Sequence, residues 1–328
     1  MPDTLAAYSL VANYSAIAVY VLAFVAFVVD ISARSSSREH VTVPAVKDSV
    51  STGSTHAEAG GRGTALLERI ARPADPHEHG STWQRTGFAL TIIAWLLHVA
   101  ALVMRGVAAG RVPWANMYEF ALTGLALVVL VFLGVQLWRD LRFLGAYVTG
   151  LVSILLALAT VNFYVAVSPL PPPLQSIWLV IHVFVATLAT GFFTVGGGLS
   201  IAQLLQSRRE AGGLERWRFL RTFPSSETLE LLANRVIIVG FAFWTFTLMA
   251  GAIWAQSAWG RYWGWDTKEV WTFIIWVLFA GYIHARATQG WRGSRSAWLA
   301  IVGLAAVLFN FTVVNLLFKG LHAYSGLS

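Results

Sequence analysis

Long apolar runs divide this chain, and they restrict its possible folds more than any other feature of the sequence. They cover approximately residues 8–29, 87–104, 119–137, 144–166, 177–205, 236–255, 270–287 and 297–318. Each is close to the roughly 20 residues that an α-helix needs to cross a lipid bilayer. With 57% hydrophobic and only 12% charged residues, a soluble domain has no means of covering so much apolar surface. The sequence therefore predicts an all-α, polytopic membrane helix bundle with eight transmembrane helices.

The basic residues predict how this bundle lies in the bilayer. Of the 23 Lys and Arg residues, eighteen lie in loops on one side of the predicted membrane and five on the other. Loops rich in Lys and Arg stay on the cytoplasmic side. With an even number of spans, both termini are then extracytoplasmic. Because orientation accounts for the net charge of +7, we expect no nucleic acid partner.

Three parts are predicted along the chain. Residues 1–29 form a first transmembrane helix, which lacks the basic start and the small-residue cleavage site of a signal peptide. Residues 30–85 form a cytoplasmic insert that is rich in Ser, Thr, Gly and charge, and we expect most of it to be disordered. Residues 87–328 form the membrane core. The chain has no cysteine, which excludes disulfides, iron–sulfur clusters and a covalent haem site on this chain.

Histidines in or beside the spans are the first candidates for function, because ionisable groups in a membrane are costly. Ser176 is a predicted helix N-cap, which places His182 near the outer end of its helix. His322 follows the last span on an outer tail, and His284 lies near the cytoplasmic end of the seventh span. A histidine in a bundle can also be a hydrogen-bonded packing residue, and this is our interpretation of His98. Two neutral imidazoles, however, can fill both axial positions of haem iron, which favours His182 and His322 as ligands.

The loop 259-WGRYWGWDTKEVW-271 contains four tryptophans between two apolar runs. An interfacial aromatic belt explains one or two tryptophans at a helix end, but not four in one loop. Flat aromatic side chains are suited to cover a porphyrin, and the predicted haem platform consists of Trp254, Trp259, Tyr262, Trp263, Trp265 and Asp266.

Charged side chains in the same loop have separate predicted roles. The string 266-DTKE-269 predicts a capping box at the start of the seventh span, in which the two acids hold the loop and the helix end. Arg261 and Lys268 are instead candidates to pair with the anionic propionates of haem.

The stretch 253-IWAQSAWGRYWGWDTKEVWTFIIWVLFAGYIHAR-286 closely resembles the WWD domain of the haem-handling proteins of cytochrome c biogenesis, in particular the CcsA/ResC family of system II, to which the actinobacterial CcsB-type proteins belong. The resemblance covers roughly residues 87–328. Further segments resemble this family in the same order: 113-PWANMYEF-120, 174-LQSIWLVIHV-183, 291-WRGSRSAWLAIVGLAAVLFN-310 and 315-NLLFKGLHAY-324.

Of the four histidines in or beside the spans, the resemblance implies a site for all but His98, which has no clear counterpart in the family. His182 and His322 are implied as axial ligands of an outer haem site, with the WWD loop at 253–271 on the extracytoplasmic face. His284 is implied as part of an inner haem site, whose opposing histidine belongs to a ResB-like partner subunit. The cofactor is then haem b, bound non-covalently and in transit.

The function implied is haem transport and presentation in a system II cytochrome c synthase in the bacterial cell membrane. Haem is held for thioether attachment to the CxxCH motif of apocytochrome c. Whether the chain is itself the enzyme stays open. One alternative is a b-type cytochrome that transfers electrons. A membrane glycosyltransferase also contains a Trp-Trp-Asp element, but it needs a metal-binding acid in an early outer loop, and 105–118 contains none.

Overall fold

The computed structural model describes residues 2–37, 81–167, 175–214, 217–318 and 320–321. Within these residues the regular structure is helical. The elements are α1 (Pro2–Ser37), α3 (Thr82–Ala109), α4 (Met117–Val135), η1 (Arg142–Leu144), α5 (Gly145–Phe163), α6 (Ile177–Glu210), η3 (Arg218–Thr222), α7 (Ser226–Trp259), α8 (Thr267–Thr288), α9 (Ser294–Phe311) and α10 (Val313–Leu317).

The predicted set of spans is confirmed. In the described part of the chain, eight helical segments are long and apolar enough to cross a membrane, the last of them formed by α9 and α10 together. The helices extend further than their apolar runs. In particular, α1 includes residues 30–37, so the first residues of the predicted insert are helical. Residues 38–80 lie outside the described residues, and their disorder stays a prediction.

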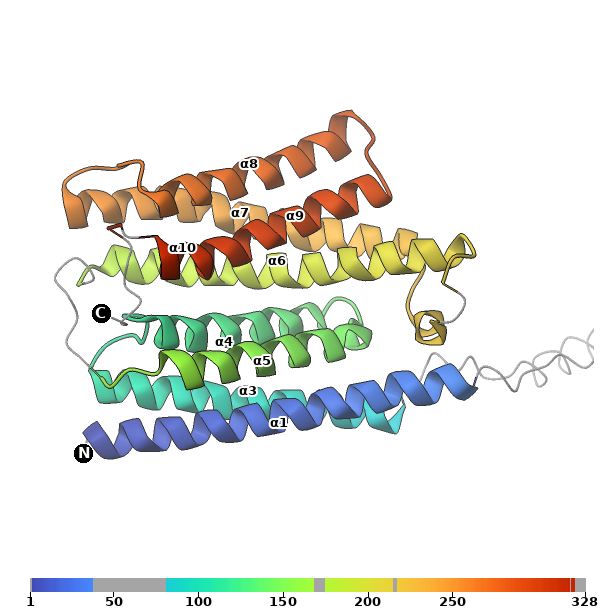
Figure 1. Ribbon diagram of the computed structural model, residues 1–328, viewed down its shortest axis with the longest axis horizontal. Helices are drawn as coiled ribbons and strands as arrows, with labels where there is room; N and C mark the ends of the chain where they lie inside the picture. Colours follow the sequence, from blue (N-terminus) through green and yellow to red (C-terminus); the bar gives the residue numbers. More distant parts are fainter. Residues whose placement is uncertain (1, 38–80, 168–174, 215–216, 319, 322–328) are drawn as a thin grey trace, which may run out of the picture.

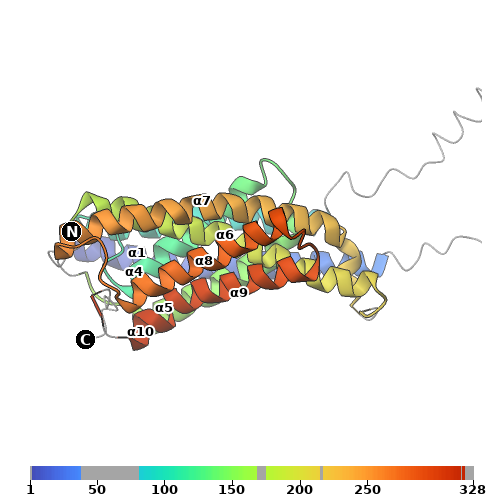
Figure 2. The same cartoon turned by 90° about the horizontal axis from the view of Figure 1, so that it is seen from above.

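The helices run along one long axis, as both views show (Figures 1 and 2). The start of α1, the loop between α7 and α8 and the end of α10 lie at the same end of the bundle (Figure 1). The opposite end carries η3 and the turn from α8 to α9. This arrangement brings together the elements that the sequence analysis predicts to be extracytoplasmic.

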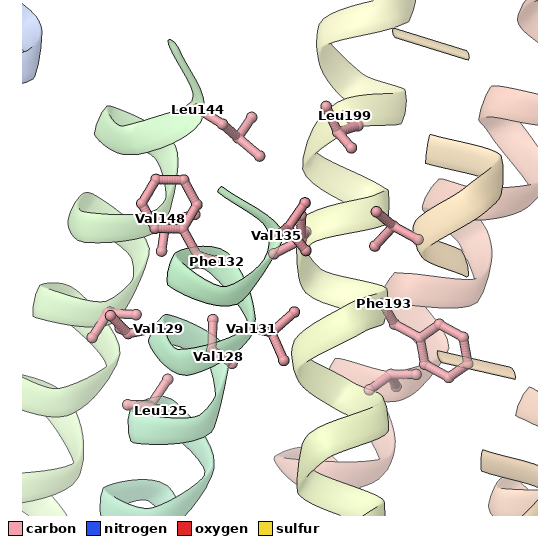
Figure 3. Close-up of a cluster of buried hydrophobic side chains, with 14 of the residues drawn as sticks. Leu125, Val128, Val129, Val131, Phe132, Val135, Leu144, Val148, Phe193 and Leu199 are labelled. Carbon is pink, nitrogen blue, oxygen red and sulfur yellow. The ribbon is translucent and has the colours of Figure 1, made fainter. Parts of the chain in front are cut away.

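The core is built around α4 and α6. Figure 3 shows α4 between α5 and α6, with Val129 on the side of α5 and Val131 toward α6. Phe193 of α6 stacks on Phe279 of α8, with ring centroids 3.7 Å apart. These buried side chains belong to one apolar cluster that extends from α1 to α9.

Three consecutive glycines at 196–198 allow other helices to approach α6 on three sides. A Cβ at these positions would collide, in chain order, with Ile237 of α7, Leu304 of α9 and Tyr147 of α5. Close helix packing in membranes commonly depends on such small residues. As a result α6 occupies the centre of the bundle, and it carries His182 near its N-terminal end, which is predicted to be extracytoplasmic.

Candidate functional site

His182 is held by α6 and α7 together. Ser176 caps α6 as predicted, because its side chain accepts a hydrogen bond from the backbone N–H of Trp178 at 3.2 Å. His182 then lies in the second turn, where its Nδ1 is 3.0 Å from the carbonyl oxygen of Thr247. A carbonyl oxygen only accepts, so Nδ1 donates this hydrogen bond, and in the neutral imidazole Nε2 carries the lone pair. A backbone carbonyl bound to one ring nitrogen commonly orients the other toward a metal.

The face of α7 that meets His182 is shaped to the ring. Trp254 lies nearly parallel to the imidazole, at 16° and with centroids 5.8 Å apart. A Cβ on Gly251 would lie 2.7 Å from the ring Cε1, so only glycine leaves room for the histidine here. Thr247, Gly251 and Trp254 follow at helical spacing and form one seat for the imidazole.

Two adjoining pockets meet at this histidine, and His182, Trp254 and Lys268 line both. The larger pocket has about 650 Å³ of empty space between α4, α6 and the end of α9 and α10. The smaller pocket, between α7, α8 and the tryptophan loop, has about 450 Å³.

Tryptophans from three segments at this end of the bundle form one cluster, and Trp254 connects it to His182. Trp114, Trp178, Trp254 and Trp259 pack in one cluster with Leu179. The rings of Trp254 and Trp259 pack edge to face, with their centroids 4.7 Å apart. The sequence analysis did not assign Trp114 and Trp178. The sequence did contain a signal for them, because both lie in segments that resemble the family, 113–120 and 174–183.

The backbone of the tryptophan loop is held by Glu269. Its Oε2 accepts hydrogen bonds from the N–H groups of Gly264 and Asp266, at 2.8 and 3.1 Å. Together with the side chain of Asp266, which caps α8, this confirms the predicted capping box. Trp265 has a positive φ of 60° and is 77% exposed. Its ring meets that of Trp263 edge to face at 5.9 Å.

The remaining charged and aromatic loop residues occupy different environments. Lys268 is partly buried, with its Nζ donating to Oδ1 of Asn315 and lying 5.4 Å from the ring centroid of Phe311. Arg261 is exposed, and its guanidinium lies against Gly264. Tyr262 is also exposed, at 62%. Of the two predicted propionate partners, the structure therefore brings only Lys268 next to His182.

His322 lies outside the described residues, and its role as a ligand stays a prediction. Gly320, two residues before it in the chain, is described, and a Cβ there would collide with Oδ1 of Asp266. Gly320 therefore lies beside the start of α8. A small pocket there is lined by Lys268, Asn315 and Gly320 among others.

A buried ion triad fixes the loop that carries Trp114. Glu119 is fully buried and accepts from Nε of Arg105 at 2.9 Å and from Nη1 of Arg111 at 2.7 Å. Its second oxygen also accepts from the N–H of Ala115 at 3.0 Å. This acid is engaged by its own loop, and the described residues contain no group of three or more metal-binding side chains. The pairing of Glu119 with these two arginines counts against the metal-binding role that the glycosyltransferase alternative needs from an acid here.

His98 and His284 lie in contrasting places. His98 is fully buried, with Nδ1 3.4 Å from the hydroxyl of Tyr20, as expected for a packing residue. His284 is exposed on α8, whereas Arg286, two residues later, points inward to an ion pair with Glu230 of α7. His98 of α3 faces Tyr20 of α1, whereas α8 packs mainly on α9 and α7, so the two histidines belong to different groups of packed helices.

Comparison with known proteins shows the family of the chain. Residues 139–322 match the family described as "Cytochrome C assembly protein". The chain is 35% identical to a cytochrome c biogenesis protein CcsA of Guillardia theta, over 74% of this chain and 86% of that protein. It is 30% identical to that of Gloeobacter violaceus, over 74% and 87%.

A solved structure described as "Cytochrome c Heme Lyase CcmF" has the same fold, with a TM-score of 0.56 and 17% identity. The match covers 94% of this chain and 46% of that one. The sequence relatives confirm the resemblance that the tryptophan loop indicated. The chain therefore belongs to the cytochrome c assembly protein family, as a member of CcsA type.

Proposed function

We propose that this chain presents haem at the extracytoplasmic face of the membrane, as a subunit of a system II cytochrome c synthase. A role in cytochrome c maturation follows from the family. The observation that carries the finer proposal is the seat of His182, whose Nδ1 is bound to the carbonyl oxygen of Thr247 beside two pockets and a tryptophan cluster.

The iron of the haem has one ligand from the bundle and one from the tail in this proposal. His182 offers Nε2, because its proton resides on Nδ1. His322 is the second ligand, and the position of Gly320 beside Asp266 supports a tail that stays close to this site. Haem b is cargo here, bound non-covalently and passed on.

The contribution of the chain to the attachment reaction is to hold the haem in position. Each thiol of the CxxCH motif adds across one haem vinyl group, with sulfur on one carbon and hydrogen on the other, so no external oxidant is consumed. The histidine of the motif displaces one of the axial imidazoles. Holding the haem while apocytochrome c docks makes the reaction effectively intramolecular. The exposed rings of Tyr262 and Trp265 supply aromatic surface at the mouth of the site.

An inner site would involve His284. An imidazole exposed on an apolar helix is costly against lipid, so a neighbouring chain is the natural cover. A ResB-like subunit with an opposing histidine meets this requirement. The tryptophan loop and both termini then face outward from the bacterial cell membrane, as the distribution of basic residues predicts.

An absorption spectrum tests the outer site. The chain is purified with its presumed partner, and the parent is compared with His182→Ala and His322→Ala. We expect a low-spin b-type spectrum in the parent, loss of haem in both variants, and recovery on addition of imidazole. His56→Ala, in the predicted insert, is the control and should keep its haem. Absence of haem from the intact complex, or haem unaffected by both substitutions, would contradict the proposal.

A further inference from the structure

One five-residue pattern recurs in three loops at the end of the bundle opposite the tryptophan loop (Figure 1). The loops from α4 to α5, from α6 to α7 and from α8 to α9 contain 138-WRDLR-142, 217-WRFLR-221 and 291-WRGSR-295. In each, an arginine follows the tryptophan and a second arginine comes three residues later. We propose that these WRxxR loops bind the headgroups of anionic phospholipids in the cytoplasmic leaflet, on the side where the basic residues place this end.

The first two WRxxR loops share their local structure as well as their sequence. Each contains a short 3-10 helix, η1 in the first and η3 in the second. The leucine of the pattern, Leu141 or Leu220, is fully buried in both and fixes the loop on the bundle. Trp138 and Trp217 are 73% and 45% exposed, and the arginine after each is also exposed. The buried leucine therefore leaves the tryptophan and the first arginine on the outside of the bundle.

The third WRxxR loop is held without a leucine. The N–H of Gly293 donates to Oε2 of the buried Glu230 at 2.8 Å. Arg292 and Arg295 are exposed, and the guanidinium of Arg295 lies 5.8 Å from the ring centroid of Trp291. This loop therefore presents the same pair of arginines beside a tryptophan.

Contacts along α6 place the first and third loops at one depth. The helices α5 and α6 run in opposite directions, and a Cβ on Gly198 would collide with the ring of Tyr147. Five residues closer to this end of the bundle are Arg142 of the first loop and Gln203 of α6. Gln203 in turn donates from Nε2 to the carbonyl oxygen of Gly293 in the third loop at 3.0 Å. The two loops therefore lie level with the same turn of α6.

Aromatic contacts bring the second loop to this depth. Phe223 directly follows η3, and its ring lies 5.3 Å from the ring of Phe143 in η1. Phe219 connects Phe223 to Trp217, with ring centroids 5.9 and 5.7 Å apart. All three WRxxR loops thus lie in one layer, as expected of loops that meet a plane of headgroups.

The chemistry of this layer fits a phosphate above acyl chains. Among the described residues the one lysine, Lys268, lies at the other end, and every basic side chain here is an arginine. A guanidinium group binds two phosphate oxygens at once, which an ammonium does not. Tryptophan favours the depth of the headgroups. Leu137, next to Trp138, is 86% exposed and continues the apolar surface of α4 toward the acyl chains.

Relative lipid affinity tests this proposal. The full-length chain in detergent is offered equal amounts of phosphatidylglycerol and phosphatidylcholine, and native mass spectrometry counts the lipids that stay bound. We expect a preference for phosphatidylglycerol. The variants change the first arginine of each pattern, because the second is paired with Asp140 in the first loop. Arg139→Gln, Arg218→Gln and Arg292→Gln should each lower the preference about fivefold, the contribution of one arginine near an anionic surface.

A matched control separates the WRxxR loops from general positive charge. Arg208 is exposed at the same end, but it lies on α6 five residues beyond Gln203 and outside the pattern. Arg208→Gln should therefore keep the parental preference. Thermal unfolding reports whether each variant is folded. If a glutamine variant does not fold, the lysine variant at that position replaces it, and it should still lower the preference because an ammonium makes no paired contact.

Three results would overturn the proposal. The first is a parent that retains both lipids equally, and the second is a preference that Arg208→Gln lowers as much as the loop variants do. The third is stabilisation of the parent by a soluble polyglutamate peptide without any preference between the lipids, which would assign the loops to an acidic protein partner. Because the loops lie at the opposite end from His182, haem binding is a separate property and does not enter this test.

Discussion

Trp265 gives the sharpest test of whether the tryptophan loop is shaped for function. Its φ of 60° lies in the left-handed region, and its side chain is 77% exposed. That conformation costs a residue with a side chain about 1–2 kcal/mol, and glycine almost nothing. Since so little of the ring is buried, its packing does not account for keeping a tryptophan here. We therefore expect Trp265 to be retained for its aromatic surface.

The stability effect can be worked out from these terms. Both Trp265→Gly and Trp265→Ala lose the edge-to-face contact with Trp263, worth about 0.5–1.5 kcal/mol. Only the glycine variant relieves the backbone, by about 1–2 kcal/mol. Glycine also gains freedom in the unfolded chain, which costs about 0.4–1 kcal/mol of stability. The free energy of unfolding of the glycine variant should therefore exceed that of the alanine variant by up to about 1.5 kcal/mol.

Two assays separate stability from function. Denaturant or thermal unfolding of the purified variants ranks their stability, and haem staining of holocytochrome c in cells measures maturation. We expect the two variants to mature cytochromes equally poorly, several-fold below the parent, although the glycine variant is the more stable. Trp138→Ala, which removes an exposed tryptophan from the opposite end, should leave the yield unchanged. If alanine is as stable as glycine, the backbone argument fails; normal maturation in both variants would refute the functional role.

Three further outcomes are expected. Gly251→Ala places a Cβ against the ring of His182, so the haem spectrum should shift or disappear, and added imidazole should restore it. Gly198→Ala should lower the stability of the bundle by about 1–3 kcal/mol through collision with the ring of Tyr147, as measured by thermal unfolding, without changing the haem spectrum of the folded fraction. Deletion of 36–62 should leave holocytochrome c yield intact, and a loss of yield with the chain still in the membrane would contradict the predicted role of the insert.

Local signals in the sequence predicted the topology and part of the site. Apolar runs gave the eight spans, and the Ser176 cap and the 266–269 capping box were recognisable because each depends on a few neighbouring residues. These signals also placed His182 at the outer end of its helix.

The contacts that hold His182 could not be predicted from such local signals. Its partner atom belongs to the backbone of Thr247, 65 residues away, and backbone carbonyls carry no sequence signature. Likewise Phe120 and Phe311, whose rings stack, are far apart in the chain, and each by itself is an ordinary apolar residue. The sequence also did not indicate that Glu119 forms ion pairs with two arginines, because that pairing depends on how the loop between α3 and α4 folds back.

The three glycines of α6 also have a consequence for the order of events during synthesis. Each glycine weakens an isolated helix by about 1 kcal/mol, so this turn depends on its neighbours for support. When α6 leaves the ribosome, two of those neighbours, α7 and α9, do not yet exist. The central turn therefore matures only when the last quarter of the chain has arrived. That same quarter supplies Lys268, Phe311 and Asn315, so the larger pocket beside His182 is complete only when translation is nearly finished.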